Sequence, residues 1–154
     1  MFDFGREKPA AKSVFDELAG SYQPPAHLRS ADGRRVTAAF LYWLERHVGE
    51  GEMAGLKKRF DEQGLSATFN AWVRTGTGFA APLLETEDVY ALLGSENVGK
   101  MAKDAGIDSP ERAAWLLTQI IPWTVTTFTP RHELPSDVVM RIGLDSFRRS
   151  LRNG

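Results

Sequence analysis

Apolar residues recur at intervals of three and four positions along most of this 154-residue chain. That interval places side chains on one face of an α-helix. The clearest case lies between Arg34 and Val48, where the repeat joins Val36, Phe40, Trp43, Leu44, His47 and Val48. No segment shows the strict alternation of apolar and polar residues that a half-buried strand needs. The sequence therefore predicts an all-α protein, a multihelical bundle of about seven or eight helices in one domain.

Local start signals divide the second half of the chain into short helices. Thr86 and Ser95 are candidate N-caps, because their hydroxyls can accept from the backbone of the first turn. Ser109-Pro110-Glu111 adds a proline at the first helical position and an acid in the first turn. Residues 86–121 are therefore predicted to form three closely linked helices. Pro122 is expected to kink or interrupt the third of them.

The two ends of the chain differ in composition. Residues 1–33 contain prolines and glycines around one short helical stretch, Ser13 to Leu18, so we expect an N-terminal arm there. Residues 34–154 are expected to form a single helical domain, with Ser136 capping a last helix. The N-terminus mixes aromatic and charged residues where a secretory signal would place an apolar core, so a cytoplasmic location is expected.

Composition and motifs indicate a protein without catalytic chemistry. There is no cysteine, which excludes thiolate metal sites and cysteine nucleophiles. His27, His47 and His132 are scattered singly, without the spacing of a metal site. Residues 94–100 follow most of the phosphate-loop pattern, but Met101 stands where a magnesium-binding hydroxyl is required. The sequence predicts no catalytic residues, no metal, no cofactor and no small-molecule substrate.

The helix predicted over residues 36–48 is apolar on every side between Phe40 and Leu44. Such a helix is either covered by several neighbours or partly an interface, and the sequence leaves both open. Aromatic side chains are frequent at binding hot spots, so Tyr42, Trp43 and Trp123 are candidates for a protein interface. The other tryptophans are expected in the core. The leading hypothesis is a non-enzymatic interaction module that binds a protein partner or a second copy of itself.

A nucleic-acid-binding protein is the alternative. Residues 96–121 have the spacing of a helix-turn-helix, which would place the third helix in the DNA groove. The candidate contacts are Arg112, Gln119, Arg148, Arg149 and Arg152. The net charge of −1 disfavours this reading, because neutralising phosphates supplies much of the affinity for DNA.

Several short motifs occur in an order that resembles the YidB-like family, a bacterial helical domain. The resemblance covers residues 53–136 and rests on Gly64-Leu65 with Trp72-Val73 and Gly76, Leu92-Leu93-Gly94, Val98 with Ala102 and Gly106-Ile107, Ala113-Ala114 with Leu116-Leu117, Ile121-Pro122, Thr129-Pro130 and Leu134-Pro135. The chain departs from the family pattern at Arg131-His132-Glu133, where a glycine is usual, and at residues 77–81. The first fifty residues show no counterpart.

The resemblance implies a multihelical bundle in which residues 86–128 form a three-helix, homeodomain-like unit. It brings no established enzyme activity and no cofactor, so no catalytic residue is carried over from the family.

Overall fold

Six α-helices and no strand occur among the residues that the computed structural model describes, which are 30–47, 52–75, 81–129, 134, 142 and 145. This confirms the all-α class. The helices are α2 (Ala31–His47), α3 (Glu52–Glu62), α4 (Ser66–Thr75), α5 (Thr86–Leu93), α6 (Ser95–Asp104) and α7 (Pro110–Phe128). The expected total of seven or eight is not confirmed, because the helix predicted at residues 13–18, and all of the helix predicted from Ser136 except the helical positions 142 and 145, lie outside the described residues.

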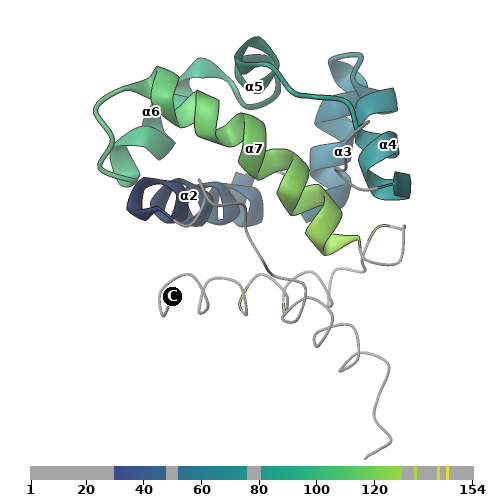
Figure 1. The fold of residues 1–154 in the computed structure, drawn as a ribbon, viewed down its shortest axis with the longest axis horizontal. Coiled ribbons are helices and arrows are strands. Elements are labelled where there is room, and N and C mark those ends of the chain that lie inside the picture. Colours follow the sequence, from purple (N-terminus) through teal and green to yellow (C-terminus); the bar gives the residue numbers. More distant parts are fainter. Residues whose placement is uncertain are drawn as a thin grey trace, which may run out of the picture.

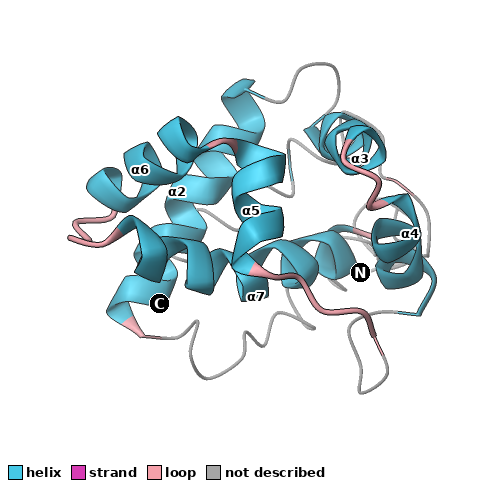
Figure 2. Ribbon diagram, turned by 90° about the horizontal axis from the view of Figure 1, so that it is seen from above, coloured by secondary structure: helices cyan, strands magenta, loops and turns pink. Residues whose placement is uncertain are grey.

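Helix α7 runs through the middle of the molecule (Figure 1). It packs against α2, α4, α5 and α6, while α3 packs against α2 and α4. Seen from above, α5 and α6 lie on one side of α7, and α3 and α4 lie together at one end (Figure 2). Because so many elements surround α7, apolar residues on nearly all of its sides are buried, including Leu117, Ile121 and Val125.

Helix α2 begins three residues before the expected start at Arg34. The hydroxyl of Ser30 accepts a hydrogen bond from the backbone N–H of Gly33 at 3.0 Å, which satisfies one of the free donors of the first turn. Asp32 adds a negative charge in the same turn. Residues 31–33 are therefore helical, and they do not belong to the predicted arm.

Helices α5, α6 and α7 follow one another as predicted, although two caps differ by one residue. Glu85 and Gly94 are the N-caps of α5 and α6, so Thr86 and Ser95 are already helical. Gly94 has φ +89° and ends α5 while it begins α6, a conformation that glycine adopts without a Cβ clash. Ser109 caps α7 as expected, accepting from the backbone N–H of Arg112 at 3.3 Å.

Pro122 does not interrupt α7. The helix continues to Phe128, although the proline ring cannot donate to the carbonyl four residues earlier. Pro122 itself is buried. We attribute the unbroken helix to the packing that surrounds it, since tertiary contacts on several sides outweigh the loss of one backbone hydrogen bond.

Candidate interaction groove

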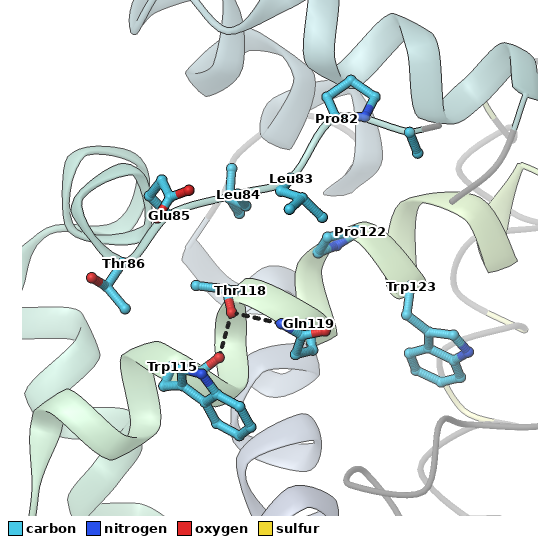
Figure 3. A pocket seen from close by; sticks show the side chains of 11 residues that line it. Pro82, Leu83, Leu84, Glu85, Thr86, Trp115, Thr118, Gln119, Pro122 and Trp123 are labelled. Carbon is cyan, nitrogen blue, oxygen red and sulfur yellow. Dashed lines mark hydrogen bonds between the residues drawn. The ribbon is translucent and has the colours of Figure 1, made fainter. Parts of the chain in front are cut away.

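An open groove of about 530 Å³ lies between residues 81–86 and one face of α7 (Figure 3). It has room for several amino-acid side chains. Its lining consists of Ala81, Pro82, Leu83, Leu84, Glu85, Thr86, Trp115, Thr118, Gln119, Pro122 and Trp123. The residues from α7 are spaced by three and four positions, so they share one side of the helix.

The wall opposite α7 is a short extended segment that is held at three points. The indole Nε1 of Trp72, a buried residue of α4, donates to the carbonyl oxygen of Pro82 at 3.0 Å. Leu84 points into the core. The carboxylate of Asp88 accepts from the backbone N–H of Glu85 at 3.0 Å, which fixes the start of α5.

Leu83 lies between these fixed points and faces the groove. Successive side chains of an extended segment point to opposite sides, so burial of Leu84 directs Leu83 outward. Leu83 is 83% exposed, the largest exposed fraction among the exposed large apolar side chains of the described residues. In Figure 3 it extends toward Pro122 on α7. The fold therefore holds an apolar side chain in solvent at a defined position.

Trp115 adds a second apolar surface to the groove. It is 49% exposed, so the expectation that it belongs to the core is wrong. The cause is its position on the outer side of α7, one turn before Gln119, where no helix of the described part covers it fully. Trp123, a predicted interface residue, is half-buried and lines the far end of the groove.

The polar groups on α7 are hydrogen-bonded locally. The amide of Gln119 donates to the hydroxyl of Thr118 at 3.1 Å, and that hydroxyl donates to the carbonyl oxygen of Trp115 (Figure 3). Among the described residues that line the groove, Glu85 is the one ionisable side chain, and none is a histidine, lysine or cysteine. These residues can bind an apolar group and orient it, and they do not form a nucleophile with an adjacent base.

Negative charge gathers beside the groove. Glu85 lines it, and Glu87 and Asp88 lie in the first turn of α5. Glu111 lies in the first turn of α7. Burial raises the pKa of Tyr90 on α5, and the charge of Glu111 raises it further as a smaller cause.

The other two predicted interface residues lie away from this groove. Tyr42 is 48% exposed on α2, with the guanidinium of Arg46 5.4 Å from its ring centre. Trp43 is 4% exposed and packs in the core between Phe40 and the guanidinium of Arg59. Tyr42 and Trp43 are neighbours in a helix and so point about 100° apart. The structure gives a surface position to Tyr42 and a core position to Trp43.

The residues of the nucleic-acid alternative are only partly described. Arg112 is exposed and forms an ion pair with Asp32 of α2, with 3.3 Å between Nε and Oδ2. Gln119 lines the groove, where its amide is bonded to Thr118. Arg148, Arg149 and Arg152 lie outside the described residues.

Two further findings concern the described residues alone. No group of three histidine, cysteine, aspartate or glutamate side chains among them is arranged to hold a metal ion. None of their helices has both the length and the apolar character that crossing a bilayer requires.

Comparison with known proteins gives one match. A family model described as YidB-like protein matches residues 31–137, which is more than half of the chain. The match begins at the first residue of α2, so the expectation that the first fifty residues have no counterpart is wrong from residue 31 onward. Neither a curated protein nor a solved structure matches the chain.

Proposed function

The chain belongs to the YidB-like family, and we propose that it is a non-enzymatic, cytoplasmic interaction module of a bacterium that binds polypeptide through the groove between residues 81–86 and α7. The observation that carries this proposal is the exposure of Leu83. Its two neighbours are held in place, Pro82 by a hydrogen bond from Trp72 and Leu84 by burial in the core. A leucine that stays exposed contributes no burial energy to folding, and a partner that covers it would gain that energy on binding.

The energetics agree with a binding site. Full burial of a leucine side chain is worth about 2 kcal/mol, and aromatic side chains are among the strongest contributors to protein interfaces. Leu83 and Trp115 both line the groove, so a bound segment can contact each of them with a different side chain. The backbone that carries them is held by helices on each side, which reduces the entropy lost on binding.

A selection experiment tests this function. A displayed library of random twelve-residue peptides is selected on the full-length protein and, in parallel, on the variant Leu83→Ser. We expect peptides that bind the wild-type protein and lose binding to Leu83→Ser. The matched control is Tyr42→Ser, which removes an exposed apolar side chain from α2 outside the groove and should bind the same peptides as the wild type. Peptides that bind all three proteins equally would refute the groove as the site.

The polypeptide that binds in the groove could be a second copy of this chain. Sedimentation velocity over a wide concentration range at physiological salt distinguishes self-association from binding of a different chain. Dimers that form with increasing concentration and are lost in Leu83→Ser would indicate that the groove takes a second copy. A single species of 17.1 kDa at every concentration would refute self-association, so that the partner would have to be a different chain.

The alternative function is nucleic-acid binding by residues 96–121, within a homeodomain-like unit over residues 86–128. The observation in its favour is the tight turn between α6 and α7, where Gly106 has φ +72° and the N–H of Ile107 donates to the carbonyl of Ala102 at 2.8 Å. It predicts retention of duplex DNA that weakens steeply with salt and falls in Arg112→Ala. The ion pair of Arg112 with Asp32 argues against it, because a phosphate contact would compete with that pair.

A further inference from the structure

We infer that the partner of the groove is a foreign polypeptide segment in which an apolar anchor residue is flanked by lysine or arginine. This inference rests on the proposed function and adds the chemistry of the partner. It combines two observations at one place, the exposed apolar walls of the groove and the acidic residues beside them.

Among the described residues, the two segments that form the walls of the groove carry a net negative charge. These segments, residues 81–93 and 109–128, carry four carboxylates and one arginine. Glu85, Glu87 and Glu111 are exposed, and of the three Glu85 lines the groove, so their charges act through solvent on a segment that approaches it. The arginine is Arg112, and its ion pair with Asp32 turns it toward α2.

This charge disfavours a second copy of the chain as the occupant. A two-fold contact brings the same surface of both chains together, so Glu85 and Glu87 of one copy would approach the same residues of the other. Like charges opposite each other oppose association. A segment that carries positive charge is attracted by the same residues, and its encounter rate rises at low salt.

The apolar walls of the groove indicate that the partner needs an apolar residue in addition to positive charge. An apolar anchor side chain that packs on Leu83 removes apolar surface from water, and a neighbouring part of the same bound segment can cover Trp115. Lysine and arginine on either side of the anchor can lay their aliphatic stems along apolar surface and keep their charges near Glu85 and Glu87.

The peptides enriched on the full-length wild-type protein provide the test, because their composition was not chosen in advance. We expect lysine and arginine beside the apolar anchor to be enriched relative to the starting library. The tightest peptide is then synthesised with its cationic residues and, as a second version, with glutamine in their place. Binding is measured by fluorescence anisotropy at low and physiological salt. The cationic version should bind more tightly, and only its affinity should fall strongly with salt.

Two protein variants localise the charge effect. The double variant Glu85→Gln with Glu87→Gln keeps hydrogen-bonding side chains and should weaken the cationic peptide by about threefold to tenfold, as expected for two exposed ion pairs. The glutamine version of the peptide should bind this variant and the wild type equally. Glu96→Gln is the matched control, because Glu96 is also exposed in the first turn of a helix, α6, but does not line the groove.

The outcomes test the partner chemistry, the interaction function and the foreign identity of the partner separately. Enriched peptides that need Leu83 but show no preference for lysine or arginine would overturn the partner chemistry and leave the interaction function standing. No enrichment on the wild-type protein beyond that on Leu83→Ser would overturn both. Dimers of the wild-type protein that are lost in Leu83→Ser would overturn the inference of a foreign chain.

Discussion

The indole N–H of Trp72 donates to the carbonyl oxygen of Pro82 at 3.0 Å, and this bond joins α4 to the segment that presents Leu83. Trp72 is fully buried and also packs edge-on against Phe60, with 5.6 Å between ring centres. Its position is therefore set by the core. This hydrogen bond therefore fixes one wall of the groove to the hydrophobic core.

Replacing Trp72 with phenylalanine should loosen this wall of the groove. The change removes the donor and part of the ring volume, so we expect a loss of about 2 to 4 kcal/mol in the free energy of unfolding. Hydrogen exchange measured by mass spectrometry should become faster over residues 82–85 in particular. Trp43→Phe is the matched control, since it removes a buried indole elsewhere and should leave exchange in that segment unchanged relative to the rest of the protein.

Arg59 joins α2, α3 and α5, and its side chain should contribute measurably to stability. Its guanidinium lies 5.1 Å from the ring centre of Trp43 and donates to the carbonyl oxygen of Leu92 at 2.8 Å. That carbonyl lies in the last turn of α5, where the helix offers it no partner. Arg59→Met keeps the stem and should lower the free energy of unfolding by about 1 to 3 kcal/mol.

Urea denaturation measures this effect, and Lys58→Met supplies the comparison. Lys58 is the exposed neighbour on α3, so its removal should change stability by less than about 0.5 kcal/mol. Equal effects of the two substitutions would contradict the role of Arg59.

The parts of the fold that are determined by residues close together in the sequence could be predicted from it. The start of α7 is an example, because Ser109, Pro110 and Glu111 act on the backbone of the same turn. The segmentation of residues 86–121 into three helices is confirmed for the same reason. The start of α2 was also readable, since Ser30 and Asp32 form an ordinary capping signal that lies within a segment expected to be an arm.

The groove depends on contacts between distant residues, and periodicity could not predict it. Helix α7 is apolar on nearly every side, so its sequence does not say that Leu116 is buried while Trp115 is exposed. Leu83 lies outside any helix and therefore in no periodic pattern. The available signal was the pair Leu83-Leu84 in a short connection, since two adjacent leucines in an extended segment cannot both face the core.

Ser66 should control the acidity of Asp61 at the junction of α3 and α4. Hydrogen bonds from the hydroxyl of Ser66 at 2.6 Å and, as a smaller cause, from the ammonium of Lys57 at 3.1 Å lower the pKa of the Asp61 carboxyl. We expect Ser66→Ala to raise this pKa and Lys57→Gln to raise it less. Carboxyl chemical shifts followed through an acid titration by NMR measure both, and Lys58→Gln should leave the pKa unchanged.

The same bond gives a signed dependence of stability on pH. The pKa of Asp61 is lower in the folded protein than in the unfolded chain, where it is about 3.9. Its contribution is therefore complete above that value and is lost as the pH falls through the folded pKa. The stability difference between the wild type and Ser66→Ala should accordingly be constant near neutral pH and shrink in acid. A difference that grew in acid would contradict the assignment.

Gly94 and Gly99 should respond in opposite directions to the same substitution. Gly94 joins α5 to α6 with φ +89° and ψ 143°, a conformation that an alanine adopts only with strain. The nearest atom to an added Cβ there is the amide nitrogen of Asn97 at 3.9 Å, so the strain is in the backbone and not in the surrounding space. Gly94→Ala should therefore cost about 1 to 3 kcal/mol of unfolding free energy.

Gly99 lies inside α6, and no atom lies within 4 Å of a Cβ added there. Alanine is the better helix former, so Gly99→Ala should raise the free energy of unfolding by about 0.5 to 1 kcal/mol. Urea denaturation of the two variants beside the wild type measures both changes. Stabilisation by Gly94→Ala would contradict the positive φ that separates α5 from α6, because an alanine avoids that conformation.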